Sequence, residues 1–382
     1  MKNILRLVAL SSALAVVASA QIRDSIEVQK GRDDKLLKRG SITYYETRWD
    51  LSELPAYKPE QKITGVIRQW GSNYFKDSPL GKAWEEGFQK FHPEVTFQDE
   101  LKTTLVAIPA LTLGLSDLGP SRHITSDELL FFQRYHESHP VEVSVVTGSL
   151  NVPGWNYAIA IYVNKDNPLA KLSIEQLDGI FGAQRAGAFV DISWDISVAR
   201  GPEKNIRTWG QLGLTGEWAD KPIHVYGYNL QYHIPRTFER LVFQGGAKWN
   251  ENLVEFTNYK NADGSTELEG KQTADAVAKD RYGIGYSGYG FATPQTKRIA
   301  VAPRGSSNAV ELNLETLHSR AYPLFDEVYF YFRHDEGKPI DPKVREFLRY
   351  ILSREGQDAV QRDAKYIPLT AAVVREQLKK LQ

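Results

Sequence analysis

Two spacings of apolar residues alternate along most of the chain. Short, nearly continuous apolar runs are typical of buried strands, whereas apolar residues that recur every three or four positions are typical of one face of a helix. The clearest helical face includes Trp84 and Phe88. The first half of the chain predicts strands at 63–70, 94–101 and 115–119, and helices at 80–91, 104–113 and 125–135. Strands that alternate with helices predict an α/β fold with a largely parallel sheet.

The second half continues this alternation around one long, loop-rich insertion at 185–221. After the insertion, a strand is expected at 223–226, followed by an amphipathic helix that ends near Phe243. Further strands are expected at 141–149, 156–164, 280–290, 298–303 and 328–336, and further helices at 173–182, 341–360 and 370–381. Two of the helices begin with the spacing of a capping box, at Thr125 and at Ser173.

The first twenty residues have the organisation of a secretory signal peptide. Two basic residues, Lys2 and Arg6, accompany a mostly apolar run at 4–17. The run leads to a cleavage signal of the A-x-A type, Ala18-Ser19-Ala20, and is too short to span a bilayer comfortably. We therefore expect cleavage near Ala20-Gln21, a periplasmic or secreted location, and no membrane insertion of the mature chain.

Composition narrows the class of protein further. Removing the signal peptide leaves 382 − 20 = 362 residues, which is enough for two ordinary domains. Residues 21–61 are charged and polar, and they predict an exposed, partly helical N-terminal extension. The chain has no cysteine, so disulfides and thiolate chemistry are excluded. Its 47 basic and 47 acidic residues balance without a long basic run, so nucleic acid is not expected as a partner.

Several motifs that suggest chemistry fail in their context. Residues 283–288 match G-x-G-x-x-G, but no amphipathic helix follows, so we expect a glycine-rich strand and turn. His136 and His139 are too few for a metal site, which needs three or four converging ligands. No G-x-S-x-G nucleophile elbow is present, and Asp191 and Asp195 lie in a predicted loop. We therefore expect no catalytic residue, no metal and no cofactor.

Small hydroxyl residues occur at three successive turns from strand to helix. Ser72 follows the first strand. Thr103 and Thr104 follow the second strand, and Ser121 and Arg122 follow the third. In an open α/β sheet, the turns at the carboxyl ends of the strands form the ligand crevice. Helix capping explains any one of these residues alone, but three such turns together with the permanent charge of an arginine favour an oxyanion site.

These turns, together with the segments given below, resemble those of the phosphate-type substrate-binding proteins of ABC importers. These proteins are the PstS-like branch of the periplasmic binding proteins. The resemblance extends over nearly all of residues 62–369, and its most specific segment is IAIYVNKDNPLAKLSIEQLDGIFGAQ. The other matching segments are LTLGLSDLGPSRHITSDEL, YGIGYSGYGF, YPLFDEVYFYF and FLRYILSREGQDAVQRDAKYIPL. The resemblance implies a type II periplasmic-binding-protein fold, in which two α/β lobes with mixed sheets close over a ligand in the cleft between them.

The same resemblance divides the chain into five parts. They are the signal peptide at 1–20, the N-terminal extension at 21–61, the first part of lobe 1 at 62–155, lobe 2 at 156–297 and the return to lobe 1 at 298–382. The predicted insertion therefore belongs to lobe 2.

One anion-binding segment of the family is altered in this chain. In the family, a loop containing Ser-Gly-Thr holds phosphate at a helix N-terminus, often with a preceding arginine. The resemblance places Tyr228 at the arginine and Tyr232-His233-Ile234 on the Ser-Gly-Thr. We expect residues 232–234 to face the cleft and to narrow it. His233 and Arg236 are then candidates to compensate for the lost donors.

These considerations define the expected function. We expect an exported solute-binding protein, not an enzyme, that binds phosphate or a related small anion and has an ABC permease as its partner. The alternative is a non-transport periplasmic interaction protein whose cleft has decayed, which the altered loop, the extension and the insertion favour. The expected ligand-binding residues are Ser72, Asn73, Tyr74, Thr103, Thr104, Ser121, Arg122, Tyr232, His233 and Arg236.

Overall fold

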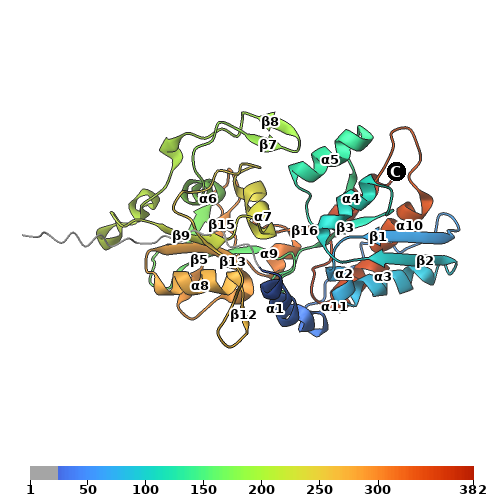
Figure 1. The fold of residues 1–382 in the computed structure, drawn as a ribbon, viewed down its shortest axis with the longest axis horizontal. Coiled ribbons are helices and arrows are strands. Elements are labelled where there is room, and N and C mark those ends of the chain that lie inside the picture. The colour runs from blue at the N-terminus through green and yellow to red at the C-terminus, as the bar shows by residue number, and fades with distance from the viewer. Residues whose placement is uncertain (1–24) are drawn as a thin grey trace, which may run out of the picture.

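The computed structural model describes residues 25–382 and contains two α/β lobes that lie side by side (Figure 1). Each lobe is built around its own large hydrophobic core. The predicted signal peptide at 1–20 lies outside the described residues. Among the residues that are described, no helix is both long and apolar enough to cross a membrane.

Lobe 1 contains two small groups of strands. β1 (Gly65–Trp70) pairs in parallel with β2 (Val95–Glu100). β16 (Glu327–Phe332), from near the end of the chain, lies between β3 (Gly119–Ser121) and β4 (Val141–Thr147) and is antiparallel to both. The end of the chain therefore supplies the central strand of this group.

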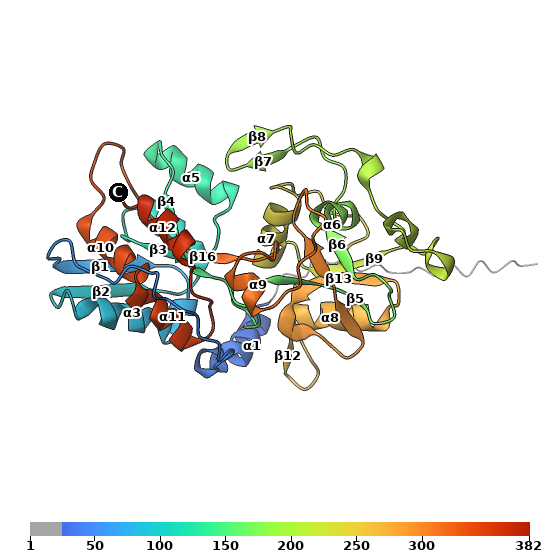
Figure 2. The ribbon, with the colours of Figure 1, turned by 180° about the vertical axis from the view of Figure 1, so that it is seen from behind.

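The helices of lobe 1 pack around the predicted apolar face of α3 (Leu80–Gln89). The side chains of Trp84 and Phe88 are almost completely buried, and α10 (Pro342–Ile351) and α11 (Arg354–Asp363) contact α3. The 3.6-residue period of this segment thus places its large side chains in the core, as the sequence predicts. Figure 2 shows α3 and α11 along the lower side of this lobe and α10 nearer to its outer end.

Lobe 2 contains a five-stranded sheet in the order β10-β9-β13-β5-β14. β13 (Gly283–Gly288) is parallel to β9 (His224–Tyr228) and antiparallel to β5 (Ile159–Asn164). At the edges, β10 (Val254–Phe256) runs parallel to β9, and β14 (Thr296–Arg298) runs antiparallel to β5. The sheets are therefore mixed, as the resemblance implies, and only some of their strand pairs are parallel.

Two helices of lobe 2 matter for the site. α8 (Glu269–Lys279) contacts β13, β9 and β5, and α7 (His233–Val242) buries Phe238 and Val242 in the core. The remaining helices are α1 (Ile26–Leu36), α2 (Tyr74–Asp77), α4 (Ala107–Thr112), α5 (Ser126–His136), α6 (Ile174–Phe181), α9 (Leu314–His318) and α12 (Ala371–Lys379). The remaining strands are β6 (Lys171–Ser173), β7 (Ala188–Val190), β8 (Ser193–Asp195), β11 (Tyr259–Lys260), β12 (Thr266–Glu267) and β15 (Ala300–Ala302).

Local sequence signals placed several boundaries correctly. The capping boxes at Thr125 and Ser173 are both formed, and residues 283–288 form a strand followed by a short 3-10 helix. The predicted helix at 341–360 is instead two helices. The chain is interrupted at Ser353, whose hydroxyl accepts a hydrogen bond from the backbone N–H of Gly356 at 3.3 Å and starts a new helix.

The prediction of an exposed N-terminal extension is wrong. α1 has exposed residues, but Tyr45, Leu51, Leu54 and Tyr57 are buried against the two lobes. The prediction rested on the many charged residues of this segment, which are typical of a solvent-exposed tail. Its apolar residues lack a helical or strand-like spacing because they follow an extended path without regular structure after α1 and the adjoining 3-10 helix.

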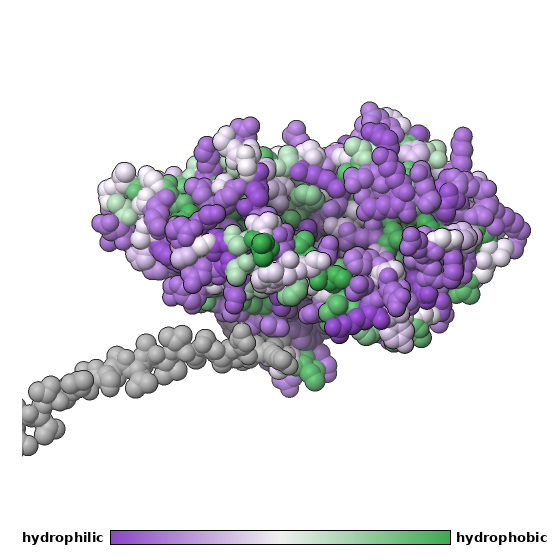
Figure 3. Space-filling view, turned by 90° about the horizontal axis from the view of Figure 1, so that it is seen from above, coloured by the Kyte–Doolittle hydropathy of each residue, from purple (hydrophilic) through white to green (hydrophobic). Residues whose placement is uncertain are grey.

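The insertion at 185–221 is attached to lobe 2 by a buried charge cluster. Arg185 donates two hydrogen bonds to the carboxylate of Asp178 at 2.8 and 2.7 Å, and Arg200 donates to the backbone oxygen of Asp178 at 3.0 Å. These arginines lie at the C-terminal end of α6, where the helix dipole favours positive charge. The β7–β8 hairpin beyond them exposes Phe189 and Trp194, while the upper face of the molecule is mostly hydrophilic (Figure 3).

We expect Asp178→Asn to lower the free energy of unfolding by about 3 kcal/mol, because it leaves two buried guanidinium groups without their carboxylate. Urea denaturation measures this change. Asp220→Asn, at an exposed position of the same insertion, should change stability by no more than about 0.5 kcal/mol. Equal stabilities of the two variants would contradict the structural role of the cluster.

Candidate ligand-binding site

The three hydroxyl-bearing turns of lobe 1 come together, as the sequence predicts. Ser72 and Ser121 are fully buried. The backbone N–H of Ser72 donates to the carbonyl of Pro120 at 2.8 Å, which joins the first turn to the third. The hydroxyl of Ser121 donates to the carbonyl of Thr104 at 3.3 Å, which joins the third turn to the second. Two hydrogen bonds therefore join the three turns to one another within lobe 1.

Three of the predicted side chains make local contacts at these turns. The hydroxyl of Ser72 accepts a hydrogen bond from the backbone N–H of Tyr74 at 3.3 Å. Thr103 accepts one from the backbone N–H of Leu105 at 3.4 Å, as the N-cap of a 3-10 helix. The amide of Asn73 donates to Asp77 at 3.0 Å. Capping thus accounts for part of the hydroxyl pattern that the sequence shows.

Among the predicted site residues, Tyr74 has a phenol whose pKa is affected by charged residues from distant parts of the sequence. Its ring lies 5.5 Å from that of Trp155, and the guanidinium of Arg39 lies 5.7 Å from the centre of the Tyr74 ring. Burial raises the pKa of the Tyr74 phenol, and the charges of Arg32 and Arg39 offset part of that rise. Asp326 also acts on this phenol, so Tyr74 lies in the electrostatic field of the junction between the lobes.

Arg122 has an internal partner. Its guanidinium, which is 8% exposed, donates to both carboxylate oxygens of Glu128, at 2.8 and 3.2 Å. Glu128 is also the third residue of α5, where it completes the capping box. Its carboxylate therefore accepts hydrogen bonds both from the backbone N–H of Thr125 and from the guanidinium of Arg122. Asp117, which is also close to Arg122 in sequence, pairs with Arg68 at 2.7 Å.

The start of α7 differs from the prediction for residues 232–234. Ile234 is buried in the core of lobe 2, so the expectation that it faces the cleft is wrong. The hydroxyl of Tyr232 accepts a hydrogen bond from the backbone N–H of Asn258 at 3.2 Å. The imidazole of His233 lies 2.8 Å from the carboxylate of Asp326. Tyr228, at the position of the family arginine, is also buried.

Arg236 does not join this group. It lies one turn into α7, its side chain is 45% exposed, and it pairs with Glu239 at 3.1 Å. His233, Thr237 and Arg240 all contact Asp326, whereas the guanidinium of Arg236 pairs with Glu239. His233 is therefore placed at the lobe junction, whereas Arg236 is not.

Asp326, which the sequence analysis did not select, is the centre of this junction. Its fully buried carboxylate binds His233, accepts from Thr237 at 3.2 Å and pairs with Arg240 at 3.1 Å. Burial alone would raise the pKa of Asp326, but the hydrogen bond from His233 and the charges of His233 and Arg240 lower it well below its usual range. The available signal was a pair of acidic residues, Asp326 and Glu327, directly before the apolar and aromatic run VYFYF.

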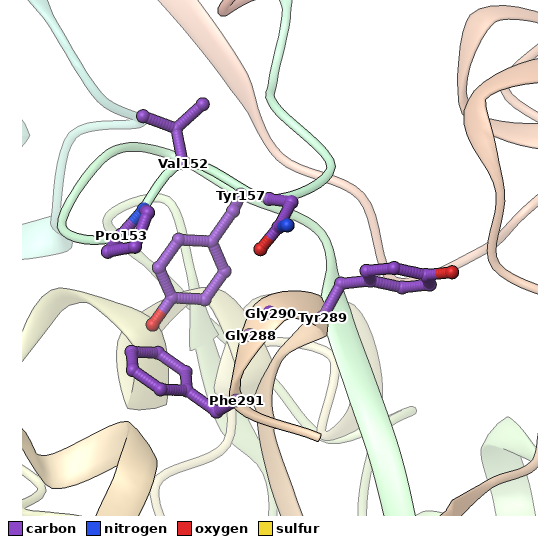
Figure 4. Close-up of a pocket in the computed structure, with 8 residues that line it drawn as sticks. Val152, Pro153, Tyr157, Gly288, Tyr289, Gly290 and Phe291 are labelled. Carbon is purple, nitrogen blue, oxygen red and sulfur yellow. The ribbon is translucent and has the colours of Figure 1, made fainter. Parts of the chain in front are cut away.

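A small cavity lies beside the crossover between the lobes. Figure 4 shows Pro153, Tyr157 and Phe291 around it, and its volume is about 10 Å³. This volume suits a single water molecule and is too small for an oxyanion. Among the described residues, no group of three or more His, Asp or Glu side chains could hold a metal ion.

The sequence matches the PBP superfamily domain over residues 77–355. It is 32% identical over 330 residues to the phosphate-binding protein PstS of Pseudomonas aeruginosa, which covers 86% of this chain and 90% of that protein. It is 23% identical over 308 residues to the phosphate-binding protein PstS of Staphylococcus haemolyticus, covering 80% and 82%. The crystal structure of PstS from Borrelia burgdorferi superposes with a TM-score of 0.50 at 15% identity, over 81% of this chain and 100% of that one.

The chain is a member of the PBP superfamily, and its two lobes agree with the fold of that class. Within it, the chain belongs to the PstS family. This membership identifies it as an extracytoplasmic substrate-binding protein and not an enzyme. The predicted family and the predicted two-lobed fold are therefore confirmed.

We expect the ionisation of Asp326 to make the free energy of unfolding depend on pH. Because the pKa of its carboxyl is lower in the folded chain, Asp326 stabilises the fold above its unfolded pKa of about 3.9, and this contribution is lost as the pH falls through the lower folded value. Asp326→Asn should therefore destabilise the chain by about 3 kcal/mol at pH 7, and the difference from the unsubstituted chain should shrink below about pH 4.

Denaturation of both proteins between about pH 2 and pH 7 measures this effect. Asp166→Asn, at an exposed position without an ion pair among the described residues, is the control and should not alter the pH profile. A constant stability difference between Asp326→Asn and the unsubstituted chain across this range would contradict the prediction.

Proposed function

We propose that this protein binds phosphate, or a closely related small oxyanion, between its lobes and delivers it to an ABC permease. The observation that carries the proposal is the 32% identity, over nearly the whole of both chains, to a protein named for phosphate binding. Lobe 1 contributes its three adjoining turns, with Ser72, Thr104 and Ser121. Lobe 2 contributes the N-terminus of α7, which carries no side-chain cap and so favours an anion.

The chemistry of these turns suits a small, fully oxygenated anion. Hydroxyl groups and backbone N–H groups donate hydrogen bonds, and such donors bind an oxyanion without a metal ion. Asn73, Tyr74, Thr103, Arg122, Tyr232 and His233 belong to the same proposed site. Arg236, whose side chain is 45% exposed and paired with Glu239, is not part of the proposed site.

The partner and the location form a second part of the proposal. The N-terminal twenty residues support export with cleavage near Ala20-Gln21, after which the mature chain would bind its ligand outside the cytoplasm. An ABC permease is the partner that this role requires. The two lobes would present their cleft-side rims to it.

A non-transport interaction protein is the second candidate function. The observation in its favour is that Arg122 and His233 have internal carboxylate partners, Glu128 and Asp326, in place of a ligand. Breaking such pairs on binding would cost free energy, and this cost lowers the expected affinity. The two functions differ in whether any oxyanion binds at micromolar concentrations.

Calorimetric titration of the mature chain, after unfolding and refolding to remove any co-purified ligand, tests the proposal. We expect phosphate to bind with a dissociation constant in the micromolar range or lower, about −8 kcal/mol, because several charge-assisted hydrogen bonds form in a protected site. Sulfate, nitrate and a sugar serve as comparison ligands. Failure of phosphate and every other oxyanion to bind would reject this function in favour of the interaction protein.

Mass spectrometry of the protein secreted from cells that produce the full chain tests the export signal. We expect a mature N-terminus at Gln21, because Ala18 and Ala20 provide the small residues of the cleavage site. Ala20→Tyr should block cleavage and leave the chain at its full mass, whereas Ala13→Val, within the apolar run, should not. An intact N-terminus on the unsubstituted secreted chain would contradict the cleavage site.

A further inference from the structure

We propose that a cavity beside the N-terminal strap, which we define as residues 25–44, is a second ligand site that binds a small organic anion with an apolar body. The cavity has a volume of about 310 Å³. Small-molecule sites in proteins have volumes of about 300–1,000 Å³ and mostly apolar walls with a few polar groups. The lining of this cavity includes no residue of the proposed phosphate site, so the inference goes beyond the proposed function.

The strap contacts both lobes. On lobe 2, the ammonium of Lys35 donates to the carbonyl of Thr266 at 2.9 Å, in the β11–β12 hairpin. On lobe 1, Arg39 pairs with Asp77 at 2.9 Å, at the end of α2. Figure 1 shows α1 at the junction of the two lobes. Because Lys35 and Arg39 also line the cavity, these contacts hold the strap in place as one of its walls.

Two close contacts with glycine position apolar side chains in the walls. A Cβ atom at Gly154 would lie 2.5 Å from Cδ1 of Leu36, and one at Gly270 would lie 2.4 Å from the ring of Phe291. The two side chains therefore lie directly against the backbone of the connection between the lobes and of α8, where glycine leaves room for them. The cavity is thus bounded by packed segments and not by a loosely attached tail.

Most of the cavity lining is apolar or aromatic. Leu36 and Leu268 are buried, whereas Ile42 is 46% exposed. A ligand that covered Ile42 would gain the free energy of removing this apolar side chain from water. Pro153 and Phe291 line both this cavity and the smaller one in Figure 4. The apolar and aromatic lining residues are Leu36, Ile42, Tyr44, Pro153, Leu268 and Phe291.

The charged residues of the lining are all basic. They are Lys35, Arg39 and Lys271, and none of the described residues that line the cavity is acidic. Lys35 and Lys271 are exposed, so a ligand can reach them from solvent. Positive groups around a concave surface raise the local concentration of anions and lower that of cations. The lining therefore favours an anionic ligand.

Carboxylates outside the lining compensate two of these three cations. They are Asp77 for Arg39, and Asp275 and Glu267 for Lys271. Lys35 differs, because its ammonium donates to a neutral carbonyl group and makes no salt bridge within the described part of the chain. Lys35 is therefore the residue that we expect to bind the anionic group of the ligand.

These features together define the chemical class of the ligand. The apolar walls favour an aliphatic or aromatic body, and the ammonium of Lys35 favours a carboxylate, phosphate or sulfonate group beside it. Inorganic phosphate has no apolar body, so it gains nothing from these walls. Octanoate is a suitable probe of this class, and octanamide, which has the same chain without the charge, is its matched neutral comparison.

Calorimetric titration of octanoate into the mature chain tests the inference. We expect octanoate to bind with a dissociation constant below about 1 mM, and octanamide to bind at least about threefold more weakly. Ile42→Trp should abolish octanoate binding, because the larger side chain fills the cavity. Ile26→Trp is the matched control, since Ile26 is 76% exposed on α1 and does not line the cavity. It should change the affinity by no more than about twofold.

A second pair of variants tests the role of the charge. Lys35→Gln should weaken octanoate binding by about threefold or more, a modest change because the ammonium is exposed and screened by solvent. Lys30→Gln removes one positive charge from an exposed position of the same helix that does not line the cavity, and it should leave the affinity within about twofold. Equal octanoate affinities of these two variants would show that Lys35 does not bind the anionic group.

The remaining outcomes decide whether the site exists. The inference is wrong if the unsubstituted chain does not bind octanoate, or if Ile42→Trp binds it as tightly as Ile26→Trp does. It is also wrong if phosphate competes with octanoate, because octanoate would then occupy the site between the lobes. Failure of phosphate to bind at all would reject the proposed function and leave this inference standing. Thermal unfolding of each variant shows whether the fold is retained.

Discussion

The buried carboxylate of Asp326 is the interaction on which the relation between the two lobes depends. It precedes the central strand of lobe 1, and it receives His233 and Arg240 from one face of a helix in lobe 2. Its backbone oxygen also accepts from Gly148 at 2.8 Å, on the first connection between the lobes. A buried charge without partners is very costly, so helix, connection and strand must keep this orientation together.

Two charged residues of the proposed site are already paired within the chain. Arg122 and His233 are held by carboxylates of their own chain and serve the architecture. The start of α7, by contrast, carries no side-chain cap.

Sequence patterns predicted the parts of this fold that depend on neighbouring residues. The apolar face of α3, the two capping boxes and the strand at 283–288 are local, and the resemblance added the two lobes and the mixed sheets. The pair of His233 and Asp326 joins positions 93 apart in sequence, and the buried residues after α1 have no regular spacing. Such contacts are set by the tertiary fold, and no single segment of the sequence contains them.

The position of β16 between β3 and β4 has a consequence for the order in which the protein matures. These two strands form no ladder with each other, and the strand that joins them is residues 327–332. Lobe 2 is largely complete in sequence before that strand emerges, whereas lobe 1 must wait for it and for the helices that follow. Contacts of such long sequence separation close slowly. Lobe 1 therefore cannot complete its sheet until the last part of the chain is present.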